Sequence, residues 1–104
     1  MFNSIKNLFS VDKTNYAQLV QDGAIILDVR SNGEYAGGHI DGSINIPVNK
    51  LADNLNKLKD KKKPIIPCCA SGMRSASAKG ILESNGYLNV HNGGAWLSLN
   101  QKIK

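Results

Sequence analysis

The residues best suited to chemistry lie in one short run that begins at Cys69 and ends at Arg74, with Ser75 directly after it. The run follows an apolar stretch that predicts a strand and precedes a pattern that predicts a helix. Main-chain N–H groups at the start of a helix lack partners within the helix, and the helix dipole adds positive potential there. We therefore expect Cys69 to be held as a thiolate, the form of cysteine that acts as a nucleophile.

This chemistry does not require a histidine base. A hydrogen bond to an ionised sulfur is worth roughly 1.5–3 kcal/mol, so two or three N–H groups suffice to favour the thiolate. Arg74 ends the loop and is placed to hold an anionic donor, or the negative charge of a sulfur carried on Cys69. The other residues expected to form the substrate cradle are Ala70, Ser71, Gly72, Met73 and Ser75.

Three side chains of the loop segment could contribute to the pocket, and two of them have an alternative role. The hydroxyls of Ser71 and Ser75 could bind a persulfide or donor oxygens, or they could cap the following helix. Met73 could form a soft apolar wall at the entrance.

Cys68 and Cys69 are the only cysteines, and they are adjacent, which excludes a structural disulfide framework. Because neighbouring strand residues point to opposite faces, we expect Cys68 to lie in the core while Cys69 faces the pocket. The alternative is that Cys68 acts as a resolving thiol. Reactive thiols persist in a reducing compartment, and the chain shows no secretory signal, so we expect a cytoplasmic protein.

Short apolar runs alternate with helical patterns along the chain, which predicts an α/β domain with a largely parallel sheet. Thr14 is expected to cap the first helix, Ser31 and Glu34 to form a capping box, and Pro67 to make its strand short or irregular. The expected strands are 24–29, 46–47, 64–68 and 88–91, and the expected helices are 14–21, 31–36, 48–58, 73–86 and 96–99.

Length and composition fit one compact domain of 104 residues. We divide it into a short amphipathic segment at 1–9, a domain at 10–100 and a C-terminal tail at 101–104 that is expected to fray. No apolar run approaches the roughly 20 residues of a membrane helix, so no membrane span is expected.

The net charge of +5 includes a dense lysine block at 57–63. No aromatic residue lies in that block and the chain has only two arginines, so nucleic-acid binding is not expected. The block is interpreted as a solvated helix end, with docking of an acidic partner or attraction of small anions as the alternatives.

The loop from Cys69 to Ser75 resembles the active-site signature of the rhodanese family, Cys-x-x-Gly-x-Arg-Ser. Two further segments resemble motifs of that family in the same order: an upstream stretch from Asp28-Val29-Arg30 to Ile46-Pro47, and a closing stretch with Gly93-Gly94 and Trp96. The resemblance covers roughly residues 10–100. It implies a rhodanese-like three-layer fold, with a five-stranded, mainly parallel sheet flanked by helices.

The resemblance also implies a reaction. Cys69 would take the outer sulfur of thiosulfate or a similar small anionic donor and pass it from a persulfide to a thiophilic acceptor: cyanide, a thiol or a protein. No metal and no organic cofactor are implied. Phosphatases with a cysteine and arginine cradle have five residues between those two, whereas this loop has four, which disfavours phosphatase and arsenate reductase chemistry.

Several other ionisable residues have a structural interpretation. In rhodanese-like domains the corresponding positions tie the loop after the family's second strand to its neighbours, so the resemblance implies ion pairs and hydrogen bonds for Asp28, Arg30, Glu34 and His39. His91 is interpreted as a surface residue, because no second histidine or cysteine stands at metal-ligand spacing.

Three functions remain compatible with the sequence: a free-standing thiosulfate sulfurtransferase, a persulfide carrier for a partner protein in cofactor or tRNA sulfuration, and a noncatalytic binding module. The intact cysteine and arginine disfavour the last. The first two differ in the acceptor, and the lysine block would suit an acidic acceptor protein.

Overall fold

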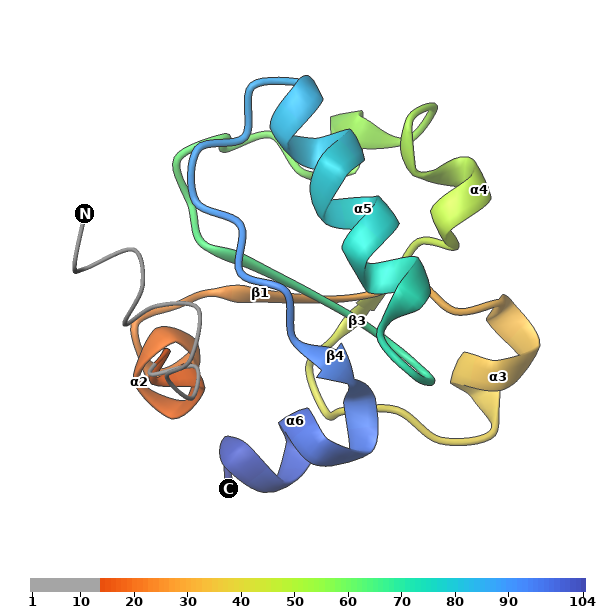
Figure 1. Ribbon diagram of the computed structural model, residues 1–104, viewed down its shortest axis with the longest axis vertical. Coiled ribbons are helices and arrows are strands. Elements are labelled where there is room, and N and C mark those ends of the chain that lie inside the picture. Colours follow the sequence, from red (N-terminus) through yellow and green to blue (C-terminus); the bar gives the residue numbers. More distant parts are fainter. Residues whose placement is uncertain (1–13) are drawn as a thin grey trace, which may run out of the picture.

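The computed structural model describes residues 14–104, in which short strands alternate with helices (Figure 1). In chain order the elements are α2 (Tyr16–Gln21), β1 (Ile25–Asp28), α3 (Asn32–Ala36), β2 (Ile44–Asn45), α4 (Val48–Leu51), the 3-10 turn η1 (Leu55–Lys57), β3 (Ile65–Cys69), α5 (Met73–Ser84), β4 (Gly94–Ala95) and α6 (Trp96–Lys102).

Four strands of the described residues form one sheet in the order β2-β1-β3-β4, and every pairing is parallel. The predicted fold class, an α/β domain with a parallel sheet flanked by helices, is confirmed. The resemblance implied five strands, whereas residues 14–104 provide four and one isolated bridge between Ile65 and Val90.

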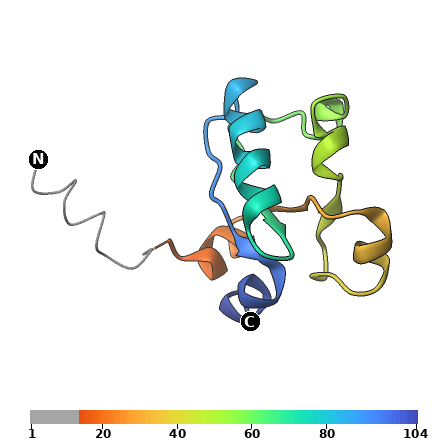
Figure 2. The ribbon, with the colours of Figure 1, turned by 45° about the vertical axis from the view of Figure 1, so that its right-hand side comes forward.

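Helices cover both faces of the sheet, with α4 and α5 on one side and α2 and α6 on the other (Figures 1 and 2). Successive residues of the central strands alternate between two cores, as a pleated strand requires. Leu27, Ile65 and Cys69 pack in the core under α4 and α5. Ile26, Ile66 and Cys68 pack in the other. Burial on both faces explains why these strands are apolar except at Asp28, the last residue of β1.

Pro67 lies in the middle of a regular, fully buried β3, so the predicted irregularity of this strand is wrong. The Pro67 carbonyl accepts a hydrogen bond from the Gly93 N–H at 2.8 Å, which places the nitrogen of Pro67 on the β4 side as well. There the register passes from Ile65 opposite Val90 to Cys68 opposite Gly94, so the partner segment carries one extra residue, a bulge. The missing N–H of Pro67 falls where the ladder is interrupted.

The same bulge displaces the last strand. The sequence predicts a strand at 88–91 and a turn at Gly93-Gly94, whereas the structure has only the bridge at Val90 in the first segment and places β4 at Gly94–Ala95.

The predicted helix at 48–58 is divided into α4 and η1. The side-chain amide of Asn54 donates to the Lys50 carbonyl at 2.8 Å, and the Asn54 N–H donates instead to Leu51 at 3.0 Å. The side chain thus takes the acceptor that an α-helix would assign to the main chain, which ends the helix. The predicted inward positions Leu51 and Leu58 are nevertheless buried.

The ends of the helices differ slightly from the expectations. Asn15, not Thr14, provides the side-chain cap of α2. The capping box of Ser31 and Glu34 is present as predicted. Helix α6 continues to Lys102, two residues into the segment expected to fray. The amphipathic segment expected at 1–9 lies outside the described residues.

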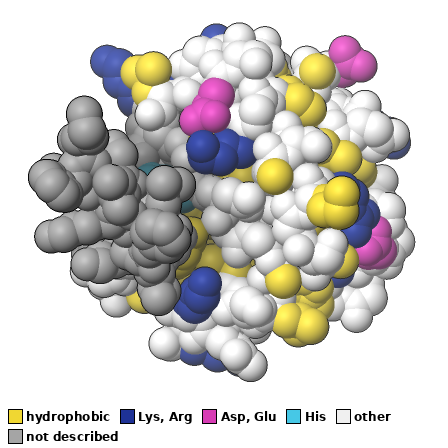
Figure 3. Space-filling model, in the orientation of Figure 1, with side chains coloured by type: hydrophobic (Ala, Val, Ile, Leu, Met, Phe, Trp, Pro, Cys, Tyr) yellow, Lys and Arg dark blue, Asp and Glu magenta, His cyan; other side chains and the backbone are white. Residues whose placement is uncertain are grey.

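Charges are dispersed on the face shown in Figure 3, where some basic and acidic side chains lie beside one another in small groups. Within residues 14–104, every helix is too short or too polar to cross a bilayer.

Candidate functional site

Cys69 is the last residue of β3, at the carboxyl edge of the sheet. The strand order changes direction between β1 and β3, and open parallel sheets bind ligands at the carboxyl edge of such a point. The chain then turns into α5 through Gly72, whose φ of 106° is costly for any residue with a side chain. The fold therefore places the predicted loop where an α/β domain forms its site.

The loop surrounds the sulfur with hydrogen-bond donors. The Gly72 N–H donates to Cys69 Sγ at 2.9 Å and the Ser75 N–H at 3.4 Å, while Sγ lies 3.6 Å from Ser75 Oγ. When Cys69 is a neutral thiol, its S–H donates to that hydroxyl. When it is a thiolate, the direction reverses and the hydroxyl donates to sulfur.

These contacts set the acidity of Cys69. Burial alone raises the pKa of the thiol, but hydrogen bonds from the Ser75 hydroxyl and from the main-chain N–H groups of Ser75, Gly72 and Ser71 outweigh burial. The pKa of Cys69 therefore lies below the ordinary value for cysteine. Cys69 has an exposed fraction of 0%, so this sulfur is both acidified and covered.

Cys68 points away from the loop into the core that contains Ile26, Ile66 and Leu99. Burial, followed by the charge of Asp28, raises the pKa of Cys68 to about 12. A thiol that stays protonated at neutral pH is a weak nucleophile. The prediction that Cys68 belongs to the core is confirmed.

Arg74 lies on the first turn of α5 and binds Glu34 of α3 through two hydrogen bonds, at 2.7 and 3.0 Å. The Arg74 guanidinium, followed by the Ser31 N–H, lowers the pKa of Glu34 to about 2. Arg74 therefore stands beside the loop as predicted, but with a carboxylate already on its guanidinium.

The remaining predicted loop residues have different surroundings. Ala70, Ser71 and Met73 form an exposed rim, and Met73 is 81% exposed. Neither serine caps α5 through its side chain. Ser75 is buried beside the sulfur, and its Oγ lies 3.0 Å from the Gly72 carbonyl.

The upstream polar residues form the predicted ion pairs and hydrogen bonds, which fix the chain after β1. Arg30 is buried, pairs with Asp28 at 2.7 Å, stacks on Trp96 and donates to the Gly38 carbonyl at 2.7 Å. His39 Nδ1 lies 2.7 Å from the Tyr35 carbonyl. This framework holds α3, and with it Glu34, against the cysteine loop.

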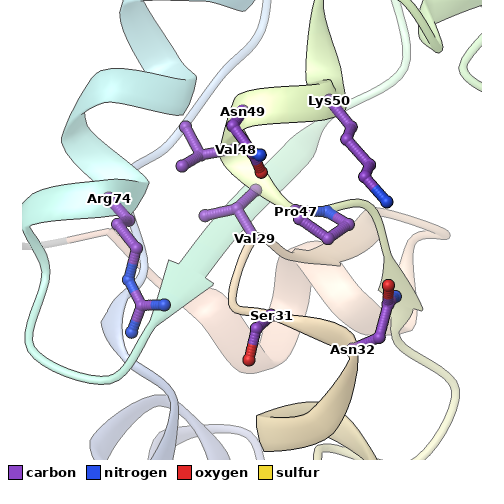
Figure 4. Close-up of a pocket in the computed structure, with 8 residues that line it drawn as sticks. All are labelled: Val29, Ser31, Asn32, Pro47, Val48, Asn49, Lys50 and Arg74. Carbon is purple, nitrogen blue, oxygen red and sulfur yellow. The ribbon is translucent and has the colours of Figure 1, made fainter.

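A pocket of about 290 Å³ adjoins the loop at Arg74 (Figure 4). Arg74 and Lys50 stand on opposite sides of the pocket, with Val29 and Val48 between them. The lining residues are Val29, Ser31, Asn32, Pro47, Val48, Asn49, Lys50 and Arg74. The lining includes two basic side chains and no acidic one, so it suits an anion that can compete with Glu34 for the Arg74 guanidinium.

One residue of the loop's surroundings was missed by sequence reasoning. Asn92 accepts a hydrogen bond from Ser75 Oγ at 2.7 Å, although the two are far apart in the chain. The sequence offers only a weak signal for it, a polar residue between a strand pattern and the Gly93-Gly94 pair.

Comparison with known proteins adds a decisive observation, because residues 12–94 match the rhodanese-like domain. The chain belongs to the rhodanese-like family. It is 31% identical over 94 residues to a tRNA uridine(34) hydroxylase of Buchnera aphidicola, a match that covers 86% of this chain and 30% of that protein. It is 34% identical over 73 residues to the thiosulfate sulfurtransferase GlpE of Pseudomonas fluorescens, covering 70% of this chain and 66% of that protein.

Solved structures of this family share the fold. The human single-domain sulfurtransferase TSTD1 superposes with a TM-score of 0.76 at 28% identity, over 91% of this chain and 97% of that one. The rhodanese-like chain described here therefore matches that single-domain protein over nearly its whole length, whereas it spans less than a third of the hydroxylase.

Proposed function

We propose that this chain is a thiosulfate sulfurtransferase that carries the transferred sulfur as a persulfide on Cys69. The observation that carries the proposal is the arrangement around Cys69 Sγ, which faces the Gly72 N–H at 2.9 Å and the Ser75 N–H at 3.4 Å. Such an arrangement stabilises negative charge on sulfur without an imidazole. Two relatives with sulfurtransferase names, GlpE and TSTD1, support the same reaction class.

The first half-reaction is a displacement at sulfur. The Cys69 thiolate attacks the outer sulfur of thiosulfate, a new S–S bond forms, and the S–S bond of the donor breaks with its electron pair leaving on sulfite. Cys69 then holds a persulfide whose negative charge lies on the outer sulfur. In the second half-reaction a thiophilic acceptor attacks that outer sulfur and the Cys69 thiolate leaves. Kinetics of the ping-pong type follow from this covalent intermediate.

The loop and Arg74 stabilise different negative charges. The N–H groups hold charge on Sγ or on the added sulfur, and the guanidinium attracts the sulfonate oxygens of the donor. Arg74 must exchange at least part of its contact with Glu34 for the donor. Both side chains are more than a third exposed, at 37% and 39%, so the pair is accessible for that exchange.

The covered sulfur implies that the loop moves when a donor binds. Cys69 has no exposed area, and the rim above it consists of residues with exposed side chains, including Met73. A small displacement of this rim admits a donor without disturbing β3.

The persulfide carrier remains the second candidate, but the lysine block does not favour it. Lys61, Lys62 and Lys63 precede β3, whereas Cys69 ends it, so the block lies at the opposite edge of the sheet from the sulfur (Figure 1). β3 alone spans about 13 Å from Ile65 to Cys69 at roughly 3.3 Å per residue, and the lysine block precedes that strand. An acidic acceptor protein bound there must reach across the whole sheet.

The proposal is tested by sulfur transfer from thiosulfate to cyanide, measured as thiocyanate, with the wild type, Cys69→Ser and Cys68→Ser. Transfer that is lost in Cys69→Ser and kept in Cys68→Ser is the expected result. Absence of transfer by the folded, reduced wild type would overturn thiosulfate as donor. Loss of transfer in the Cys68→Ser variant alone would show that the reactive thiol is Cys68 and not Cys69.

A further inference from the structure

Asn92 occupies the bulge between the Val90 bridge and β4, beside the cysteine loop. The next residue fixes its place: a Cβ on Gly93 would lie 2.8 Å from Ile66 and 2.9 Å from Leu99, so only glycine fits there unchanged. The main-chain carbonyl of Asn92 accepts a hydrogen bond from Tyr16 Oη at 2.8 Å. The side chain of Asn92 is therefore presented to the loop by a firmly held backbone.

The atom of Asn92 that faces Ser75 is an acceptor. The Gly94 N–H donates to Asn92 Oδ1 at 3.0 Å, and an N–H can only face the oxygen of the side-chain amide. Ser75 Oγ lies 2.7 Å from the same oxygen and donates to it. If Ser75 turns away, Oδ1 keeps the hydrogen bond from Gly94.

Ser75 has a single hydroxyl hydrogen and three atoms that compete for it. Asn92 Oδ1 is the nearest at 2.7 Å, followed by the Gly72 carbonyl at 3.0 Å and Cys69 Sγ at 3.6 Å. A neutral thiol does not need this hydrogen, because its own S–H donates to Ser75. A thiolate carries no hydrogen, so the Ser75 hydroxyl adds to the stabilisation by the loop N–H groups only when it donates its hydrogen to the sulfur.

We propose that Asn92 is a positioning residue that takes the Ser75 hydroxyl hydrogen while Cys69 Sγ is uncharged and yields it when that sulfur is ionised. Its amide oxygen thereby disfavours the thiolate relative to the thiol. In the persulfide, which rests on the proposed function, the charge lies on the outer sulfur, and the hydroxyl is again free to donate to Asn92. Asn92 therefore favours the persulfide form of Cys69 over the thiolate, and the less stabilised thiolate is the more reactive nucleophile.

No other charged or titratable group described near the sulfur competes with Cys69 for the Ser75 hydroxyl hydrogen. Arg74 is bound to Glu34, and Cys68 lies in the opposite core. Among the described residues, the hydrogen-bond partners of Ser75 Oγ are Cys69, Gly72 and Asn92.

The test measures the midpoint of Cys69 ionisation from the pH dependence of alkylation by iodoacetamide, which needs no sulfurtransferase activity. Removal of the competing acceptor in Asn92→Ala should move the midpoint to lower pH and raise the thiolate fraction below it by about two- to tenfold, the range for one neutral hydrogen bond. Ser75→Ala should move the midpoint to higher pH. The double variant should match Ser75→Ala, because the amide then has no hydroxyl to compete for.

A merely structural role gives a different pattern. Loosening of the loop would raise the limiting alkylation rate at high pH and would remove N–H donors, which moves the midpoint up. An unchanged or higher midpoint in Asn92→Ala overturns the proposal, as does a lower midpoint that persists without Ser75. If Asn92→Ala fails to fold, Asn92→Asp decides. The carboxylate of Asn92→Asp keeps an acceptor for the Gly94 N–H. The proposal requires that Asn92→Asp raise the pH midpoint of Cys69 ionisation by more when Ser75 is present than in the Ser75→Ala background.

Discussion

Replacement of Arg74 by glutamine should separate its role in the reaction from its role in stability. The Arg74–Glu34 pair has good geometry, at 2.7 Å, but both side chains are more than a third exposed. Exposed ion pairs contribute about 0–1 kcal/mol, so the free energy of unfolding of Arg74→Gln should fall by no more than about 1 kcal/mol. A guanidinium that binds the sulfonate of thiosulfate contributes roughly 1.5–3 kcal/mol, which corresponds to a fall in kcat/KM of about 10- to 150-fold.

The same helix provides a matched control. Lys79 pairs with Glu83 at 3.2 Å, and its side chain is 36% exposed against 37% for Arg74. Lys79→Gln should therefore cost a similar, small amount of stability and leave kcat/KM for thiosulfate unchanged. Stability is measured by urea unfolding, and kcat/KM by thiocyanate formation at fixed ionic strength. Equal kcat/KM for wild type and folded Arg74→Gln would refute the assignment of donor binding to Arg74.

Three further predictions concern the surroundings of the loop. Glu34→Gln keeps an acceptor for the capping box but removes the charge that competes for the guanidinium, so KM for thiosulfate should fall; a higher KM would contradict this competition. Gly93→Ala should destabilise the fold by about 1–3 kcal/mol, because its Cβ would lie 2.8 and 2.9 Å from two core side chains. The matched control is Gly80→Ala in the middle of α5, whose Cβ would have open space around it: thermal unfolding should show this variant to be more stable than the wild type by roughly 0.5–1 kcal/mol and Gly93→Ala to be less stable. Alkylation of the native protein at neutral pH should modify Cys69 alone, because Cys68 stays protonated until the pH approaches its pKa of about 12. The pH midpoint of Cys69 alkylation should lie below that of the urea-unfolded chain, because the folded loop favours the thiolate. Two modified thiols at neutral pH would show that Cys68 is not held in the core as an unreactive thiol.

Local chemistry made the centre of the site predictable from sequence. Cys69 is followed within three residues by Gly72, which turns the chain, and then by a helix start, so its N–H partners are close neighbours in sequence. The alternation of a buried strand likewise separates Cys68 from Cys69 with no knowledge of distant residues. The family resemblance added the order of the elements.

Contacts between distant segments were not predictable in the same way. Glu34 was expected to form an ion pair, but its partner Arg74 stands 40 residues later, and Asn92 stands 17 residues from Ser75. Pro67 was judged from its missing N–H alone, whereas the bulge that accommodates it belongs to another segment. The helix break at Asn54 depends on one side-chain hydrogen bond that competes with the helix, which hydrophobic periodicity does not register.

The intact mass of the protein after incubation with thiosulfate tests the persulfide on Cys69 most directly. The reduced wild type and Cys68→Ser should each gain one sulfur, about 32 Da by atomic mass, on the single reactive thiol expected of this loop. Cys69→Ser should gain none, and cyanide should remove the added mass from the other two. Addition of sulfur to folded Cys69→Ser, or its absence from the folded and reduced wild type, would contradict the account.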